Sequence, residues 1–325
     1  MELVPRKRLE IYSGRSHPEL VRAVAENLHI EPGAVSLREF ADGEIHCRFG
    51  ESVRGKDIFI VQSHSKPVND SIVEQLIMID AAKRASAKRI TAVCPYFGYS
   101  RQDRKAAGRE PITAKLVMDM LAAAGADRVI TIDLHSGQIQ GFFNGPVDHL
   151  TAMPVLVDYL REFEGSDLVV IAPDAGRVKV ASRFSQLLNL DLGFVHKRRP
   201  RGTFNVVEAL DIVTEVDLRG RRCVIIDDLI DTAGTICAAA ELLKKRGATE
   251  VWAMATHAVL SGPAVDRLKA SEIGRVVVTD TLPLPPEAYF DKLEVLSVAR
   301  IIAQAIGAVF EDSSVSEIFQ GDNLI

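Results

Sequence analysis

The stretch VIIDDLIDTAGT (Val224–Thr235) gives the strongest indication of fold and chemistry. Its apolar start predicts a buried strand that ends in two acidic residues, Asp227 and Asp228, followed by a turn of small and hydroxyl-bearing residues. The next segment, Ile236–Arg246, has a helical pattern. A turn of small residues before a helix suits a phosphate, because backbone N–H groups and the helix dipole favour an anion. Carboxylates at a strand end suit the hydroxyls of a sugar or a bound Mg²⁺.

Short β-branched and apolar runs alternate with helical patterns on both sides of this stretch. Helices are predicted at Ile72–Ala85 and Ile112–Ala124. Alternation of this kind predicts an α/β fold in which parallel sheets are flanked by helices. The predicted strands are Asp57–Val61, Ile90–Cys94, Arg128–Ile132, Leu168–Ala172, Cys223–Ile226, Glu250–Ala255 and Arg275–Val278.

The two halves of the chain resemble each other. A helix, a Gly-Ala pair, a strand and a histidine follow in the same order and spacing, ending at His135 in the first half and at His257 in the second. The strands KDIFIVQS and SDLVVIAP open the two patterns. We therefore expect two copies of one α/β unit, with domains at residues 1–150 and 151–325, because Val147–Pro154 interrupts the apolar pattern with prolines and an aspartate.

Composition excludes several classes of protein. The chain has 325 residues, 47% of them hydrophobic, and a net charge of −5, which is typical of a globular protein rather than a disordered, collagen-like or nucleic-acid-binding one. Neither a signal peptide nor a membrane span is indicated, and the four cysteines show no metal-type spacing, so a reduced, cytoplasmic protein is expected. The GxxxxGK[ST], GxGxxG, GxSxG and HExxH motifs do not occur.

The stretch Val224–Thr235 resembles the motif that binds phosphoribosyl pyrophosphate (PRPP) in type I phosphoribosyltransferases and in ribose-phosphate pyrophosphokinases (PRPP synthetases). The metal-site signature of the second family is similar to DLHSGQIQGFFNGPVD (Asp133–Asp148) along its full length. Other segments resemble that family in the same order: REFADGE (Arg38–Glu44), PYFGYSRQDRK (Pro95–Lys105), REPITAK (Arg109–Lys115), KRRPR (Lys197–Arg201) and SGPAVDRL (Ser261–Leu268). The chain is identified as a member of the pyrophosphokinase family.

The resemblance implies two similar type I phosphoribosyltransferase-like domains, each a parallel sheet flanked by helices. It also implies the transfer of the β,γ-pyrophosphoryl group of ATP to the C1 hydroxyl of ribose 5-phosphate, which gives PRPP and AMP. Ribose 5-phosphate would contact Asp227, Asp228, Asp231, Thr232, Ala233, Gly234 and Thr235. ATP would contact Phe40, Asp42, Gly43, Glu44, Arg101, Gln102 and Asp103, and Tyr96 with Phe97 suggests stacking on the base.

Further roles are implied by the same resemblance. Mg²⁺ would be bound by His135 and Asp174, and Lys197 with Arg199 would be the catalytic cations of a flexible loop within His196–Val206. His257, at the repeat position of His135, is interpreted as structural. Family members form hexamers built from dimers, with Phe40–Glu44 reaching the ATP of a neighbouring subunit, so a homo-oligomer without nucleic-acid or membrane partners is expected.

Two alternatives stay open, and the sequence departs from the family pattern near the predicted site. A nucleobase phosphoribosyltransferase would share the PRPP motif, and a regulatory paralogue without catalysis would share most motifs. The family usually has Pro-Asp-x-Gly-Gly where this chain has Asp174-Ala175-Gly176-Arg177 after Pro173, so Arg177 is interpreted either as an extra anion contact or as a side chain that points outward. Ala107-Gly108 stands where the family often has Arg-Ser, which predicts altered activation by phosphate.

Overall fold

The computed structural model describes residues 7–163, 167–197 and 210–319. By its internal contacts the chain divides into two units. The first comprises Met1–Thr151, Thr281–Pro283 and Ser297–Asn323, and the second comprises most of the remainder, from Ala152 to Asp280 and from Leu284 to Leu296. The C-terminal segment thus returns to the first unit, which a single boundary at residue 150 leaves out.

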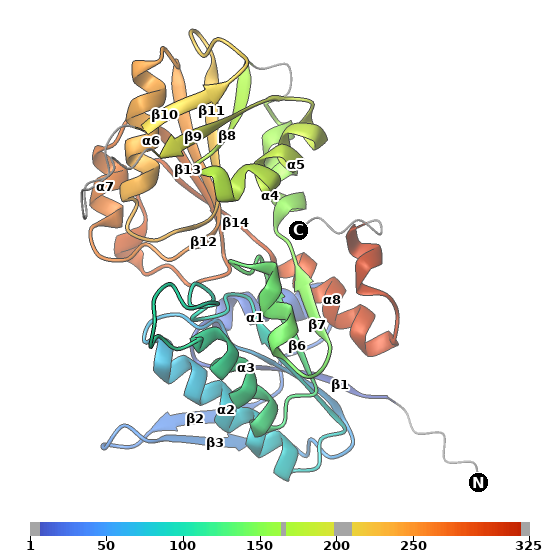
Figure 1. The fold of residues 1–325 in the computed structure, drawn as a ribbon. Helices are drawn as coiled ribbons and strands as arrows, with labels where there is room; N and C mark the ends of the chain where they lie inside the picture. The colour runs from blue at the N-terminus through green and yellow to red at the C-terminus, as the bar shows by residue number, and fades with distance from the viewer. Residues whose placement is uncertain (1–6, 164–166, 198–209, 320–325) are drawn as a thin grey trace. The chain divides into compact units, whose positions relative to one another are not determined.

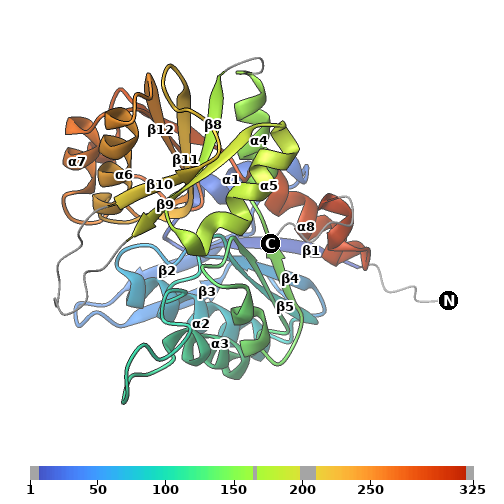
Figure 2. The ribbon, with the colours of Figure 1, turned by 45° about the horizontal axis from the view of Figure 1, so that its top comes forward.

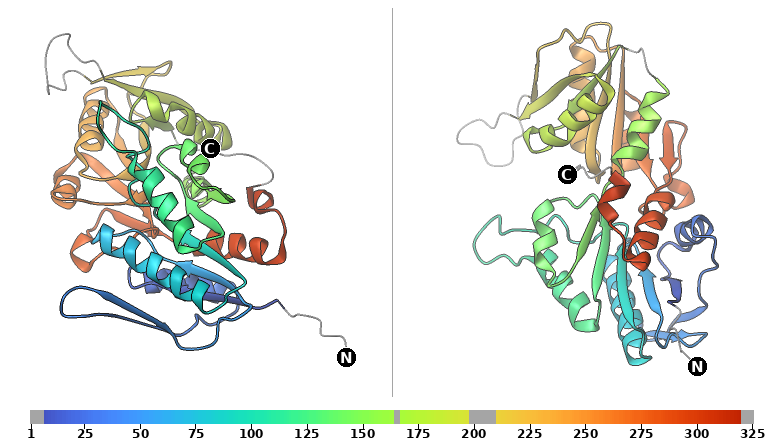
Figure 3. Two further views of the ribbon diagram at one scale, coloured as in Figure 1. Left: turned by 60° about the horizontal axis from the view of Figure 1, so that its bottom comes forward. Right: turned by 90° about the vertical axis from the view of Figure 1, so that its right-hand side faces the viewer.

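The first unit contains a parallel sheet and an antiparallel hairpin (Figure 1). Within the described residues the sheet has five strands in the order β1-β4-β5-β6-β7, and every neighbouring pair is parallel. These strands are Leu9–Ser13, Asp57–Val61, Arg89–Cys94, Arg128–Ile132 and Val147–Leu150. The hairpin consists of β2 (Val35–Glu39) and β3 (Ile45–Phe49). Figure 3 shows its tip extending away from the sheet.

Four helices accompany the first sheet in the described chain: α1 (Pro18–Asn27), α2 (Val68–Arg84), α3 (Thr113–Ala124) and α8 (Ala299–Glu311). The apolar faces of α2 and α3 pack on buried side chains of β4, β5 and β6. The late helix α8 packs against α1. Its end is fixed by Asp312, which accepts a hydrogen bond of 2.6 Å from Arg89 and pairs with Lys7. These contacts explain why α8 belongs to the first unit.

The second unit contains a larger sheet with the described order β10-β9-β8-β11-β12-β13-β14. Among the described strands of this sheet, only the pair β9–β10 is antiparallel. The strands, in chain order from β8 to β14, are Leu168–Ala172, Asp191–Lys197, Leu210–Thr214, Arg222–Ile230, Glu250–Ala258, Ile273–Thr279 and Leu293–Leu296. The helices are α4 (Met153–Arg161), α5 (Val178–Leu188), α6 (Gly234–Lys245) and α7 (Ala264–Ala270).

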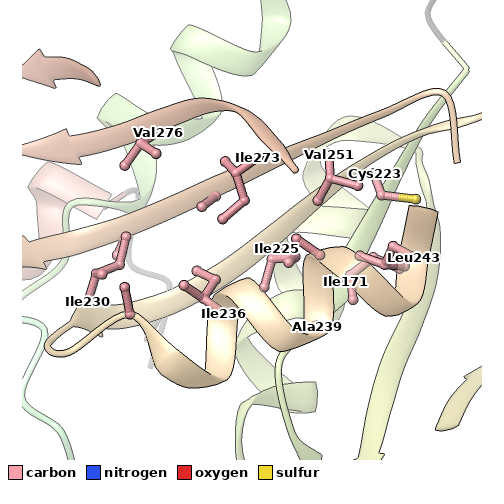
Figure 4. Close-up of a cluster of buried hydrophobic side chains, with 14 of the residues drawn as sticks. Ile171, Cys223, Ile225, Ile230, Ile236, Ala239, Leu243, Val251, Ile273 and Val276 are labelled. Carbon is pink, nitrogen blue, oxygen red and sulfur yellow. The ribbon is translucent and has the colours of Figure 1, made fainter. Parts of the chain in front are cut away.

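Helices cover both faces of this second sheet (Figure 2). Alternate residues of a strand point to opposite faces, so the strands β8, β11 and β12 are buried on both sides. On one face Ile225 packs with Ile236 and Leu243 of α6 (Figure 4). On the other face Val224 and Trp252 belong to a cluster with residues of α4 and α5. This two-sided burial holds the end of β11 in place beside α6.

The predicted α/β fold with helix-flanked parallel sheets is confirmed. The sheet orders match the repeat for four strands, because β4-β5-β6-β7 corresponds to β8-β11-β12-β13 in both sheet position and chain order. The next positions differ in chain order, since β1 precedes β4 whereas β9 follows β8. One interpretation was wrong: Val147–Leu150 does not merely interrupt the apolar pattern but forms β7, an edge strand paired with β6. Within the part of the chain that the structure describes, no helix is long and apolar enough to cross a membrane.

Candidate active site

The acidic pair Asp227 and Asp228 lies inside strand β11 rather than after it. The sequence predicted a strand that ends at Ile226, but pairing with β12 continues to Ile230. The strand is longer because Ile230 is itself buried and pairs with Ala258 of β12. The two carboxylates therefore stand on a rigid ladder close to its carboxyl end, where parallel α/β sheets bind their ligands.

The loop Asp231–Thr235 connects β11 to α6 in a tight turn. Ala233 has a left-handed backbone conformation, with φ of 60°, directly before the first helical residue, Gly234. The loop is held from outside, because Arg267 Nη1 donates a hydrogen bond of 3.0 Å to the carbonyl oxygen of Thr232. Thr232 and Thr235 are exposed. An exposed, pre-formed turn at a helix N-terminus presents backbone N–H groups to an anion.

Arg177 bridges the two carboxylates. Its Nη2 lies 2.6 Å from Oδ1 of Asp228, and its Nε lies 3.2 Å from Oδ1 of Asp227. Burial and the neighbouring Asp228 carboxylate raise the pKa of Asp227 to about 8, and the charge of Arg177 opposes that rise. The interpretation of Arg177 as an outward-pointing side chain was wrong, because the side chain points to the acidic pair. The interpretation as an added anion contact stays a prediction. The adjacency of β8 and β11 brings these residues together.

Asp174 begins the short helix Ala175–Arg177 that follows β8. Its Oδ1 accepts a hydrogen bond of 3.0 Å from the N–H of Gly176, which is the arrangement of a helix cap. This contact orients the carboxylate at the carboxyl end of β8, the strand beside β11. The departure from the family's glycine pair therefore leaves the cap at Asp174 intact.

In the first unit, His135 follows the end of β6. Asp133, between them, has φ of 38°, a left-handed conformation that few residues other than glycine adopt. The turn is held by the N–H of Asp133, which donates to the carbonyl of Leu150 at 2.9 Å, and by the N–H of Leu134, which donates to Nε2 of His149 at 2.8 Å. His135 is half-buried beyond the strand, whereas its repeat counterpart His257 is buried within β12. The two histidines therefore differ in burial, and their roles stay predictions.

The segment Phe40–Glu44 forms the exposed tip of the β2–β3 hairpin. The N–H of Phe40 donates to the carbonyl of Glu44 at 2.8 Å, and the N–H of Glu44 donates to Oδ1 of Asp42 at 3.1 Å. Gly43 has φ of 92°, which allows the chain to reverse there. The ring of Phe40 is 47% exposed, with the Arg38 guanidinium 5.6 Å from its centre. A large exposed ring on an ordered tip can contact another molecule.

The segment Arg101–Asp103 lies in a turn after β5. The N–H of Gln102 donates to the carbonyl of Tyr99, and its Oε1 accepts a hydrogen bond of 2.6 Å from Thr113 at the start of α3. The suggested stacking role of Tyr96 and Phe97 was wrong, because both rings are buried, Phe97 being 2% exposed. Apolar aromatic residues that follow a central strand are drawn into the core.

Two predicted catalytic residues fall at or outside the limit of the description. Lys197 ends β9, and only its backbone is described. Arg199 lies outside the described residues. Among residues 7–163, 167–197 and 210–319, no group of three or more His, Cys, Asp or Glu side chains is gathered that could hold a metal ion. Sequence reasoning missed one functional contact, the bridge of Arg177; its only signal was an arginine where the family has glycine.

Comparisons with known proteins identify the family of this chain and agree with its fold. The model of the N-terminal domain of ribose phosphate pyrophosphokinase matches residues 9–125, and that of the phosphoribosyl synthetase-associated domain matches residues 200–320. Ribose-phosphate pyrophosphokinases of Streptomyces avermitilis and Bifidobacterium longum are 53% and 54% identical, over 96% and 98% of this chain and 96% and 94% of theirs. The phosphoribosylpyrophosphate synthetase structure from Mycobacterium smegmatis superimposes with a TM-score of 0.89 at 48% identity, covering 94% of this chain and all of that one.

Proposed function

The chain belongs to the ribose-phosphate pyrophosphokinase family, and from that premise we propose that it makes PRPP and AMP from ATP and ribose 5-phosphate. The oxygen of the C1 hydroxyl attacks the β-phosphorus of ATP, the bond from that phosphorus to the α,β-bridging oxygen breaks, and the hydroxyl proton is released. The observation that carries the proposal is the strand β11 with its acidic pair, followed by the small-residue loop at the start of α6. The described structure gives no reason to favour a phosphoribosyltransferase or a regulatory paralogue.

We assign ribose 5-phosphate to the carboxyl end of β11. The backbone N–H groups of Asp231–Thr235 suit the 5-phosphate, since they stand at the positive end of the α6 dipole. Asp227 and Asp228, on the strand that leads into this loop, accept hydrogen bonds from the ribose hydroxyls. Together these groups hold the sugar by its phosphate and its ring, which orients the C1 hydroxyl.

ATP is assigned to two segments of the first unit, Phe40–Glu44 and Arg101–Asp103. The exposed ring of Phe40 offers a surface for a base, and the side chains at Asp42, Glu44 and Gln102 offer hydrogen-bond partners. The family resemblance places the first segment at the ATP of a neighbouring subunit, so we propose a homo-oligomer, a hexamer built from dimers. The projecting, exposed tip of the β2–β3 hairpin supports this arrangement (Figure 3).

Mg²⁺ is the proposed cofactor, with Asp174 and His135 as protein ligands. The carboxylate of Asp174 supplies the oxygen donor that Mg²⁺ prefers, and its orientation by Gly176 fits a fixed ligand. When bound, the ion neutralises the phosphate oxygens. Lys197 and Arg199 are proposed to stabilise the charge that develops on the transferred group, since this class of transfer depends on positioning and electrostatics. The four free thiols of the chain support a cytoplasmic location.

The direct test is incubation of the full chain with Mg²⁺, ATP and ribose 5-phosphate, with AMP and PRPP measured separately. Equal amounts of both products are expected. A folded protein that makes neither product, with inorganic phosphate supplied, contradicts the proposed function. A protein that instead consumes PRPP with a free nucleobase is a phosphoribosyltransferase.

A further inference from the structure

Arg177 is placed to serve the acidic pair of the sugar site. It ends the short helix after β8 and is followed directly by α5, so its backbone is fixed on both sides. Its side chain is 16% exposed and reaches Asp227 and Asp228 through two different nitrogens. A guanidinium has several N–H donors in a rigid plane and can contact two carboxylates at once, which an ammonium does with less directional control.

The acidic pair needs such a partner. The two carboxylates are neighbours in sequence, and their side chains are 24% and 8% exposed. Adjacent like charges that are largely withdrawn from water disfavour ionisation, and one of them takes up a proton when no positive charge is near. A protonated or reoriented carboxyl is a weaker acceptor for a hydroxyl. The positive charge of Arg177 counters both effects.

Stabilisation of the fold does not account for this contact. A buried ion pair adds little net stability, because the loss of hydration offsets most of the attraction. The contact uses Oδ1 of each aspartate, and a carboxylate has about four acceptor positions, so it leaves acceptor capacity for hydroxyl groups. The arginine also adds positive charge close to the loop assigned to the sugar phosphate.

We propose that Arg177 is a positioning residue for ribose 5-phosphate, which holds Asp227 and Asp228 oriented toward the sugar hydroxyls and favours their charged forms. This inference rests on the proposed function. The glycine that the family usually has at this position lacks such a side chain and cannot make this contact. Arg177 acts through the aspartates and takes no part in the bond changes.

The experiment compares wild type with two variants. Arg177→Met removes the positive charge and keeps a long side chain, and Arg177→Lys keeps the charge but loses the planar guanidinium group with its several N–H donors. The KM for ribose 5-phosphate, the KM for ATP and kcat are measured at saturating concentration of the other substrate. We expect Arg177→Met to raise the KM for ribose 5-phosphate about tenfold, with kcat and the KM for ATP changed less than threefold. Arg177→Lys should give an intermediate KM.

Arg222→Met is the matched control. Arg222 also pairs with an aspartate, Asp167, across β8 and β11, but at the opposite end of these strands. The KM of the Arg222→Met variant for ribose 5-phosphate should stay within twofold of wild type. If Arg177→Met does not fold, Arg177→Gln and Arg177→Lys are compared, and the lysine variant should have the lower KM.

Two results would overturn the proposal. An unchanged KM in Arg177→Met means that the arginine does not serve the sugar site, and a lowered KM means that it competes with the sugar for the aspartates. Wild-type turnover in the same assay separates these results from a failure of the proposed function, which would abolish AMP and PRPP in every variant including wild type.

Discussion

In the first unit Arg89, at the start of β5, pairs with Asp57 at the start of β4, with a distance of 2.6 Å between Nη2 and Oδ2. In the second unit Arg222, at the start of β11, pairs at 2.9 Å with Asp167, directly before β8. The repeat thus keeps an arginine–aspartate pair at the amino ends of corresponding strands. These ends tie neighbouring strands together in both units and have no part in the assigned substrate sites.

The carboxyl ends of the same strands differ. Counted from the two arginines, Cys94 of the first unit corresponds to Asp227 of the second; counted from the two aspartates, His64 corresponds to Asp174. His64 is fully buried, accepts a hydrogen bond from the N–H of Gly98 at 2.9 Å and contacts Gln75, and burial lowers its pKa to about 4. The first unit has buried, neutral side chains at these two positions, whereas the second has carboxylates that we assign to ligands.

The largest expected effect comes from Lys197, at the carboxyl end of β9. In the first sheet β1 occupies the same position beside β4, although it precedes β4 in the chain, and it ends at Ser13. Lys197→Ala should lower kcat by about 10²–10³-fold, or ~3–4 kcal/mol, because it removes a cation that we propose stabilises the transferred group. Ser13→Ala should leave kcat within twofold. Steady-state kinetics with ATP and ribose 5-phosphate measure both effects. If kcat of Lys197→Ala stays within threefold of wild type, Lys197 has no catalytic role.

The arginine–aspartate pairs provide the next test, because their burial differs. Asp57 is 3% exposed, whereas Asp167 is 41% exposed. Arg89→Met leaves a buried carboxylate without its main partner and should lower the free energy of unfolding by about 3 kcal/mol. Arg222→Met removes an exposed pair and should cost about 0.5 kcal/mol. Chemical denaturation of both variants measures the difference. Equal decreases in the free energy of unfolding would show that the two pairs contribute equally to stability.

The sequence predicted most of the central strands because they are β-branched and buried on both faces, a pattern that is visible locally. It placed the end of β11 too early, because two acidic residues are unusual inside a buried strand. The pairing with β12 nevertheless continues to Ile230. It also missed β7, a four-residue edge strand. Pairing with a neighbouring strand decides both cases, and local sequence does not encode it.

The site shows the same limit. The loop Asp231–Thr235 and the acidic pair could be predicted because they are contiguous in sequence. The bridge from Arg177 could not, because it depends on β8 lying next to β11, which is a property of the sheet. Likewise, the return of α8 to the first unit depends on its packing against α1 and on the pairing of Asp312 with Arg89. Sequence motifs thus indicated the candidate ligand-binding groups, and the fold brought Arg177 to them.

A substitution at Asp228 tests the difference at the carboxyl ends directly. Asp228→Asn keeps the size of the side chain but loses its charge, and should lower kcat/KM for ribose 5-phosphate by roughly 10- to 150-fold, the value of a hydrogen bond to a charged group. In the first unit Cys94, at the position that corresponds to Asp227, is fully buried, so Cys94→Ala should leave kcat/KM within twofold and affect only stability. A loss of activity in Cys94→Ala equal to that in Asp228→Asn would mean that the corresponding positions of the two units do not differ in function.

The smallest effect is expected in the pH dependence of the sugar site. Because the pKa of Asp227 is raised to about 8, this carboxyl carries a proton below that pH and becomes a full acceptor above it. The value of kcat/KM for ribose 5-phosphate should therefore rise by at most about tenfold between pH 7 and 9. His64, which occupies the position of Asp174 in the first unit, has a pKa lowered to about 4 by burial and does not titrate in this range.

Two variants identify the group that titrates. Asp227→Asn should remove the rise in kcat/KM near pH 8, because no carboxyl is left to lose the proton. Arg177→Met should move the rise to higher pH, because the arginine lowers the pKa of Asp227 in the wild type. If kcat/KM for ribose 5-phosphate rises near pH 8 equally in wild type, Asp227→Asn and Arg177→Met, another group titrates. Sugar binding then does not depend on the charge of Asp227.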